Sequence, residues 1–311
     1  MPAELLPVAV VIPTRDRTAA LRRTLESLAH QSAQPAELSI VDASADVSTR
    51  SLCVEEAIPN LRSAVLWHGA HLAGAASQRN QGVRGCSQPV IGFMDDDILF
   101  EPDCFGRLWS ALHSDERIGG VNAMITNQRY QSPGRISQIV FRLLDNRPES
   151  SYAGSVLGPA VNLLPEDRED LPEVVPVEWL NTGCTLYRRE ALPDPPFPDH
   201  FKGYSLMEDL TLSLTVGRCW KLANARTARI YHDSQPGTHK FAPDLIAEMQ
   251  LVNRHYVMTK VLGRSRFSDY LKLFLFELFS LVSILQVPAG RMAFGPTLRG
   301  KARGCRLIMT K

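Results

Sequence analysis

The sequence has 311 residues, of which 44% are hydrophobic and 22% are charged, a composition that allows one large or two smaller well-packed globular domains. Its formal net charge of +1 gives no global basic field, so nothing in the total charge suggests general nucleic-acid binding, and any charge asymmetry is local. The six cysteines include no closely spaced pair, which argues against a zinc ribbon or a thioredoxin-type motif and fits a reducing compartment.

Strands and helices alternate through the first part of the chain. Residues 8–12 are apolar and mostly β-branched, as in a buried strand, and apolar residues then recur at helical spacing from Leu21 to Leu28. A second predicted strand at 36–41 ends at Asp42. A strand, a helix and a strand at this spacing predict a parallel sheet. Because the first apolar run is too short for a signal peptide, we expect a cytoplasmic protein.

Three consecutive aspartates, Asp95, Asp96 and Asp97, directly follow an apolar run in the segment 89–102. In open α/β sheets, ligands bind outside the carboxyl ends of the strands, so these carboxylates are predicted at a cleft. Adjacent carboxylates repel one another, and a divalent cation such as Mn²⁺ or Mg²⁺ would hold them together and attract phosphate. The alternative is a solvated acidic turn at the start of a helix.

Three other segments carry candidate site residues. Residues 71–82 are rich in small side chains and include Arg79, which can face a phosphate or a base, although a lone arginine is also common at the surface. Glu208 and Asp209 open a predicted helix, either as partners of its dipole or with one of them as a general base. His232 follows a late predicted strand, where it is either structural or an additional metal ligand or phosphate contact.

Six short motifs together carry a resemblance to a known family. They are Val-Ile-Pro-Thr-Arg at 11–15, Ile-Val-Asp-Ala-Ser at 40–44, Gln-Arg-Asn-Gln-Gly at 78–82, Phe-Met-Asp-Asp-Asp at 93–97, Thr-Gly-Cys at 182–184 and Glu-Asp at 208–209. Each motif alone is weak, but in this order they resemble family 2 of the nucleotide-sugar-dependent glycosyltransferases, which have the GT-A fold. No Gly-x-Gly-x-x-Gly or P-loop motif competes with this interpretation.

The resemblance implies a chemical role for the candidate residues. A metal at the Asp triplet would neutralise the diphosphate leaving group, and one carboxylate would deprotonate the acceptor hydroxyl, with inversion by analogy with inverting glycosidases. The implied general base is Asp209, with Glu208 as the other candidate. The remaining predicted contacts are Pro13, Thr14, Arg15, Asp42, Arg79, Asp95 and Asp96 for the nucleotide sugar, Trp179, Thr182 and Gly183 for the acceptor, and Asp97, Asp95 and His232 for the metal.

Residues 270–285 are the most apolar stretch of the chain and keep a polar stripe at helical spacing, with Lys272 and Glu277 among its members. This pattern predicts an amphipathic helix, and the segment from Pro288 onward adds basic residues without any acidic one. Such a combination is typical of peripheral attachment to an anionic membrane, here the cytoplasmic face. The alternatives are a helix packed on the catalytic domain or in a homo-oligomer.

The sequence as a whole predicts an α/β protein with a GT-A type nucleotide-binding sheet flanked by helices and a helical C-terminal extension. We expect a glycosyltransferase domain at 1–240, with a nucleotide-sugar-binding half at 1–125 and an acceptor-binding half at 126–240, and a basic extension at 241–311. The predicted activity is transfer of a sugar from a nucleotide-diphosphate donor to a glycan or lipid-linked acceptor, without a nucleic-acid partner. The alternatives are a sugar nucleotidyltransferase and a non-catalytic sugar-nucleotide-binding module.

Overall fold

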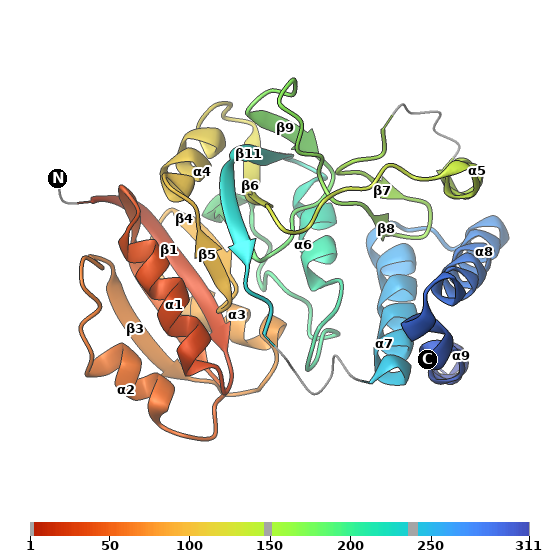
Figure 1. Ribbon diagram of the computed structural model, residues 1–311, viewed down its shortest axis with the longest axis horizontal. Helices are drawn as coiled ribbons and strands as arrows, with labels where there is room; N and C mark the ends of the chain where they lie inside the picture. Colours follow the sequence, from red (N-terminus) through yellow and green to blue (C-terminus); the bar gives the residue numbers. More distant parts are fainter. Residues whose placement is uncertain (1–2, 146–150, 236–241, 311) are drawn as a thin grey trace. The chain divides into compact units, whose positions relative to one another are not determined.

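The computed structural model describes residues 3–145, 151–235 and 242–310 (Figure 1). The chain divides into two compact units. The sheet unit comprises Met1–Tyr130 and Leu164–Gln235, and the helical unit comprises Gln131–Leu163 and Pro236–Lys311. Residues 131–163, which the sequence analysis placed in the acceptor-binding half, therefore group with the C-terminal helices. The predicted boundary at residue 240 lies outside the described residues.

The sheet unit contains a mixed nine-stranded sheet with the strand order β3-β2-β1-β4-β10-β6-β11-β5, and β9 pairs with β11 outside this path. The pairs β1–β2, β2–β3, β1–β4 and β6–β11 are parallel, whereas β10 runs antiparallel to both of its neighbours. The strands are β1 (Glu4–Thr14), β2 (Ala33–Asp42), β3 (Ala64–Gly69), β4 (Val90–Met94), β5 (Ile98–Phe100), β6 (Ile118–Ile125), β9 (Val174–Val177), β10 (Cys184–Arg188) and β11 (Lys221–His232).

Helices pack on both faces of this sheet. On one face, Ile12 of β1 shares a buried cluster with Leu21 and Leu25, which lie one helical turn apart on α1. On the other face, α3 lies so close to β1 that a Cβ atom on Gly82 would come within 2.3 Å of Val11 Cγ1. The helices of this unit are α1 (Thr18–Ala29), α2 (Ser48–Val54), α3 (Ala75–Arg84), α4 (Cys104–Leu112) and α6 (Glu208–Val216).

Several polar segments meet at one edge of the sheet because of this topology. Thr14 at the end of β1 pairs with Asp42 at the end of β2. The neighbouring β4 ends at Met94, directly before the Asp triplet. Since β10 runs the other way, its first residue, Cys184, pairs with Met94. His232 ends β11 and pairs with the first residue of β5. The motifs at these strand ends are therefore neighbours in space.

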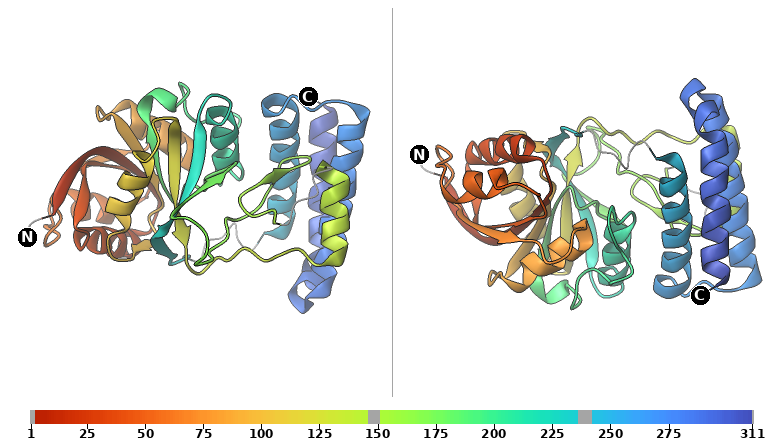
Figure 2. Two further views of the ribbon diagram at one scale, coloured as in Figure 1. Left: turned by 90° about the horizontal axis from the view of Figure 1, so that it is seen from above. Right: turned by 90° about the horizontal axis from the view of Figure 1, so that it is seen from below.

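The helical unit has a small core of its own. Its four long helices lie side by side (Figure 2). Phe141 and Leu144 pack with Leu157, and Phe276 covers this cluster. The elements are α5 (Arg135–Asp145), β7 (Val156–Leu157), β8 (Val161–Asn162), α7 (Pro243–Tyr256), a π-helical turn (Val257–Val261), α8 (Phe267–Ser283), a 3₁₀ turn (Ile284–Gln286) and α9 (Pro288–Met309).

The predicted fold class, a sheet flanked by helices with a helical C-terminal extension, is confirmed. Among its described residues, the extension contains the helices α7, α8 and α9. The chain turns at Ile284–Gln286 after α8, and Pro288 then begins α9 at a position where the missing N–H of proline costs no helical hydrogen bond. Within residues 3–145, 151–235 and 242–310, no helix combines the length and the apolar character that crossing a membrane requires.

Candidate active site

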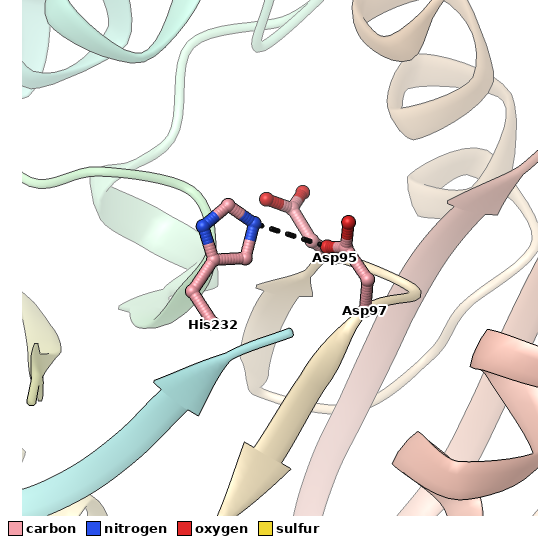
Figure 3. A group of neighbouring side chains, drawn as sticks. All are labelled: Asp95, Asp97 and His232. Atoms are coloured by element: carbon pink, nitrogen blue, oxygen red, sulfur yellow. Dashed lines mark hydrogen bonds and ion pairs between the residues drawn. The ribbon is translucent and has the colours of Figure 1, made fainter. Parts of the chain in front are cut away.

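Asp95, Asp97 and His232 form a cluster where the loop after β4 meets the end of β11 (Figure 3). One ligand atom of each residue, two carboxylate oxygens and an imidazole nitrogen, lie within 4.8 Å of one another. His232 Nε2 is 3.1 Å from Asp97 Oδ1. Carboxylate and imidazole donors at this spacing fit a divalent transition-metal cation such as Mn²⁺.

The surroundings of Asp97 favour its ionised form. Burial opposes ionisation, but hydrogen bonds from His232 and from the backbone N–H of Gln235, together with the charge of Arg17, lower the pKa of this carboxyl group below its usual range. Arg17 Nη1 lies 3.3 Å from an oxygen of Asp97 and 3.3 Å from an oxygen of Asp96. The sequence carries no signal for this position of Arg17, because a charged residue after a strand is common on protein surfaces.

Asp96 is turned toward β1 and α1. The Thr14 hydroxyl donates a hydrogen bond of 2.6 Å to Asp96 Oδ2, and the Thr24 hydroxyl donates one of 2.9 Å to the backbone oxygen of Asp96. Burial raises the pKa of the Asp96 carboxyl group to about 6, although the bond from Thr14 opposes this effect. Thr14 and Asp96 were both predicted to contact the nucleotide sugar, and in this structure they bind each other.

Arg79 joins the metal-binding cluster to the acidic pair. Its side chain is 3% exposed, Nη2 lies 2.7 Å from Asp95 Oδ1 and Nη1 lies 2.9 Å from Glu208 Oε1. Its Nε atom is buried without a hydrogen-bond partner among the described residues. Both terminal nitrogens thus bind carboxylates in this structure. The contact of Arg79 with the base or the diphosphate, which the resemblance implies, stays a prediction.

Glu208 and Asp209 occupy the first turn of α6, and burial raises the pKa of both carboxyl groups. For Glu208 the neighbouring charge of Asp209 adds to this effect, and the charge of Arg79 opposes it. Asp209 Oδ1 accepts a hydrogen bond of 2.7 Å from the N–H of Leu210. Arg79 Nη1 thus donates a hydrogen bond to Glu208, whereas Asp209 forms no ion pair with any residue that the structure describes.

Asp42 lies at the end of β2 with both carboxylate oxygens bound. The indole N–H of Trp67 donates to Oδ2 at 3.1 Å, and the backbone N–H of Ser44 donates to Oδ1 at 2.8 Å. Gln78 Nε2 donates to backbone oxygens at the ends of β1 and β2. A side chain of α3 therefore holds these two strand ends together, a role that only the fold reveals.

Pro13 and Arg15 flank Thr14 at the end of β1 and differ in accessibility. Pro13 is half-buried and Arg15 is exposed. The guanidinium group of Arg15 lies 3.5 Å from the carboxylate of Asp16, and both side chains are more than half exposed. Arg15 therefore belongs to the accessible border of this edge of the sheet, and its contact with a nucleotide stays a prediction.

The segment before β10 approaches the Asp triplet. The backbone N–H of Asp95 donates a hydrogen bond of 3.1 Å to the oxygen of Gly183, which places this glycine beside the metal-binding cluster. Thr182 and Trp179 are buried, at 5% and 6% exposure. Of the three residues predicted to contact an acceptor, Gly183 is thus the one that the structure brings next to Asp95.

A sheet that gathers carboxylates, an imidazole and an arginine at the carboxyl ends of its strands has the form of an α/β enzyme that binds a charged ligand there. The model of the family "Glycosyl transferase family 2" matches residues 9–193, more than half of the chain, and the protein belongs to this family. Validoxylamine A glucosyltransferase from Streptomyces hygroscopicus subsp. limoneus is 37% identical over 98 residues. This match covers 30% of the present chain and 21% of that relative.

Solved structures of low sequence identity share the fold. Mannosyltransferase PcManGT from Pyrobaculum calidifontis, in complex with GDP-Man and Mn²⁺, has a TM-score of 0.55 at 15% identity, with 99% of this chain and 80% of that chain covered. GalNAc-T7 with UDP, GalNAc and Mn²⁺ has a TM-score of 0.54 at 15% identity, and the match covers 82% of this chain and 47% of that chain. S. aureus TarS 1-349 with UDP-GlcNAc has a TM-score of 0.51 at 14% identity, and the match covers 95% of this chain and 89% of that chain. The predicted family and GT-A type fold are confirmed.

Proposed function

We propose that this protein transfers a sugar, with inversion, from a nucleotide-diphosphate donor to a hydroxyl group of a glycan or lipid-linked acceptor. The observation that carries the proposal is the convergence of a metal-binding donor set, a buried arginine and an acidic pair at one edge of the sheet. Glycosyl transfer needs these parts, because the leaving diphosphate must be neutralised while the attacking hydroxyl loses its proton.

Asp97, Asp95 and His232 would hold the divalent cation. When bound, Mn²⁺ or Mg²⁺ supplies Lewis-acid neutralisation of the diphosphate charge. Mn²⁺ suits this donor set better, because Mg²⁺ prefers oxygen ligands and His232 offers nitrogen. The structures of PcManGT and GalNAc-T7, which share the fold, are described with Mn²⁺, and this supports the same cofactor here.

The donor nucleotide would lie beyond the ends of β1 and β2. One side of the base and the ribose would be lined by Pro13, Thr14 and Arg15. Asp42 would accept a hydrogen bond from the base or the ribose. The side chain of Arg15 is exposed and can therefore reach a ligand at this edge. Relatives of the same fold are described with GDP-Man and with UDP-GlcNAc, so more than one base is a reasonable candidate for the donor.

Asp209 would act as the general base. Glu208 is held by Arg79 at 2.9 Å, and burial raises its pKa to about 8, so that near pH 7 it mostly holds a proton already. Asp209 forms no ion pair with a described residue, and no cation of the described residues competes for its carboxylate. A pKa raised toward neutrality by burial suits a base that works near pH 7. The acceptor would approach past Gly183, with Trp179 and Thr182 shaping the wall behind it.

Product analysis tests this function. The full chain would be incubated with Mn²⁺, a panel of nucleotide-diphosphate sugars and a panel of glycan and lipid-linked acceptors. We expect free nucleoside diphosphate and a glycoside of inverted configuration. Release of pyrophosphate from a nucleoside triphosphate and a sugar phosphate would instead identify a sugar nucleotidyltransferase. Intact donor with every acceptor, in spite of donor binding, would favour a non-catalytic binding module.

The cysteines support the cytoplasmic location that we propose for this reaction. All six are free thiols, and Cys86, Cys104 and Cys184 are buried. Burial raises the pKa of the Cys86 thiol to about 11, so this residue is an unreactive part of the core. A protein with six unpaired cysteines fits a reducing compartment.

A further inference from the structure

The outer side of α8 is apolar along its whole length. Its exposed apolar residues recur three or four positions apart and therefore lie on one side of the helix. The charged residues of α8, Asp269, Lys272 and Glu277, are all partly buried. The exposed apolar residues are Phe267, Tyr270, Leu271, Phe274, Leu275, Leu278 and Val282, with exposed fractions from 39% to 84%.

A charged residue of α8 points into the interior of the helical unit. The Glu277 side chain is 12% exposed, and its carboxylate binds Arg254 at 3.1 Å and also binds Lys301 of α9. A helix on the surface of a soluble protein usually turns its apolar side inward and its charged side to water. In α8 the buried residues Leu273 and Leu281 are apolar as expected, but Glu277 is turned inward with them and the outer side is apolar too, although buried ion pairs are costly to form.

A second helix of the same unit, α5, also exposes apolar residues. Ile136, Ile139 and Leu143 of α5 are 71%, 59% and 62% exposed, whereas Phe141 and Leu144 on the other side of α5 are buried. The two helices touch each other. Of the 24 large hydrophobic residues that are exposed among the described residues, 17 belong to the helical unit. We call the exposed apolar residues of α5 and α8 the apolar face.

Basic residues border the apolar face. Arg135, Arg142, Arg266 and Arg291 are exposed, and none of them forms an ion pair with a residue that the structure describes. Arg291 donates a hydrogen bond of 3.0 Å to the backbone oxygen of Leu285, which places it at the end of the face. By sequence, the helical unit has 15 Lys and Arg against 6 Asp and Glu, and the sheet unit has 19 against 27. The net charge of +1 therefore conceals a strongly basic unit.

We propose that the apolar face, with its basic border, inserts into the surface of an anionic lipid bilayer. Apolar residues enter the boundary between headgroups and acyl chains, while arginines at their edge bind anionic headgroups. A second copy of this chain is the weaker candidate, because two faces bordered by unpaired arginines would repel each other. The inference goes beyond attachment through the C-terminal helix, since it assigns α5 an equal part, and it does not depend on the proposed function.

Vesicle binding tests this proposal. The full chain would be sedimented with phosphatidylcholine vesicles that contain roughly zero, 20 or 40% phosphatidylserine, so that the anionic fraction of the membrane is the variable. We expect binding that rises with the anionic fraction and falls in high salt. Phe274→Glu combined with Leu278→Glu should lower the partition coefficient by roughly tenfold or more. Ile139→Glu alone should lower it too, because α5 belongs to the same face.

Two comparisons control this experiment. Val54→Glu changes an equally exposed apolar residue of α2 in the sheet unit and should leave binding unchanged. Arg135→Gln combined with Arg142→Gln preserves the apolar residues and should lower binding roughly tenfold on anionic vesicles alone. Since these arginines are exposed, this variant tests the proposal even if the glutamate variants fail to fold.

Several outcomes would overturn the proposal. No binding at any phosphatidylserine content, or equal binding of wild-type protein and the Phe274→Glu, Leu278→Glu variant, would show that the face does not meet the bilayer. Equal binding to zwitterionic and anionic vesicles would remove the role of the arginines. A dimer in sedimentation equilibrium that this variant dissociates, with no vesicle binding, would identify the face as a contact between two copies.

Discussion

Arg79 connects the two acidic groups of the candidate site. It lies 16 positions from Asp95 and 129 positions from Glu208 in the sequence, yet binds both carboxylates, at 2.7 Å and 2.9 Å. Its guanidinium carbon also lies 5.8 Å from the centre of the Phe197 ring. Breaking a buried ion pair on one side leaves an uncompensated charge. Arg79 therefore fixes the positions of these two carboxylates, which is the kind of preorganisation that electrostatic catalysis needs.

The role of Asp97 as a metal ligand can be tested by its removal. We expect Asp97→Ala to abolish the dependence of nucleotide binding on Mn²⁺ while the fold persists, because one of several clustered like charges is lost. The measurement is thermal stabilisation by nucleoside diphosphates with and without Mn²⁺. Asp170→Ala, which removes an exposed carboxylate, is the control. An Asp97→Ala protein that keeps full Mn²⁺-dependent stabilisation would contradict the assignment.

The choice between Asp209 and Glu208 as general base rests on matched amide variants. Asp209→Asn keeps the size of the side chain but cannot accept a proton, so turnover should fall by roughly 10²- to 10⁴-fold with donor affinity nearly unchanged. Glu208→Gln should have a smaller effect. Steady-state kinetics of both variants with one donor provide the measurement. A larger loss of turnover in Glu208→Gln would assign the base to Glu208 instead.

The buried acidic pair should also affect stability as a function of pH. Burial and the charge of Asp209 raise the pKa of Glu208 to about 8, from about 4.3 in an unfolded chain. Since the folded state holds this proton more tightly, the contribution of Glu208 to the free energy of unfolding is lost as pH rises from about 4.3 to about 8. We expect urea unfolding of the metal-free protein to show this decline, and Glu208→Gln to flatten it.

The control for this pH experiment is Glu190→Gln, which changes an exposed glutamate on the short 3₁₀ turn Arg189–Ala191. Its pH profile should match that of the wild-type protein. If Glu208→Gln also follows the wild-type profile, the proton uptake on folding belongs to other groups.

At the scale of elements, the packing of α9 on α7 depends on small residues. Gly300 and Gly304 are the buried residues of α9. Gly304 lies against Leu251 of α7, and a Cβ atom on Gly300 would stand 2.0 Å from the backbone oxygen of Asp244. Arg303, between them in sequence, binds Asp244 and Glu248 of α7. The two helices are thus held by close backbone approach together with ion pairs at the edge of the contact.

Glycine substitutions test this close approach. Gly300→Ala should destabilise the helical unit by about 1–3 kcal/mol, because α9 must move away from α7 to make room for the methyl group. Gly295→Ala on the same helix meets only the end of the Arg299 side chain, at 3.8 Å, and should stabilise α9 by about 0.5–1 kcal/mol. Hydrogen exchange of the α7 and α9 amides provides the measurement. Equal protection in the two variants would show that the contact tolerates a side chain.

At the scale of the whole molecule, two units of different composition share one chain. The sheet unit carries more acidic than basic residues and contains the candidate site. The helical unit is basic and holds most of the large apolar side chains that are exposed among the described residues. Each has a core of its own. The near-zero net charge of the whole chain is therefore not the charge of either unit, because the acidic excess of one unit cancels the basic excess of the other.

The sequence alone determined the fold class and the family, because apolar periodicity and short ordered motifs are local properties of the chain. It also predicted Asp95 and Asp97 as metal ligands, with His232 as an additional one, and the structure brings these three side chains together. The tertiary structure decided that Arg79 binds Asp95 and Glu208, that Arg17 lies beside the Asp triplet and that residues 131–163 group with the C-terminal helices. It also decided which side of α8 faces inward. An amphipathic pattern shows that a helix has two sides, but long-range contacts such as that of Glu277 with Arg254 select the side that is buried.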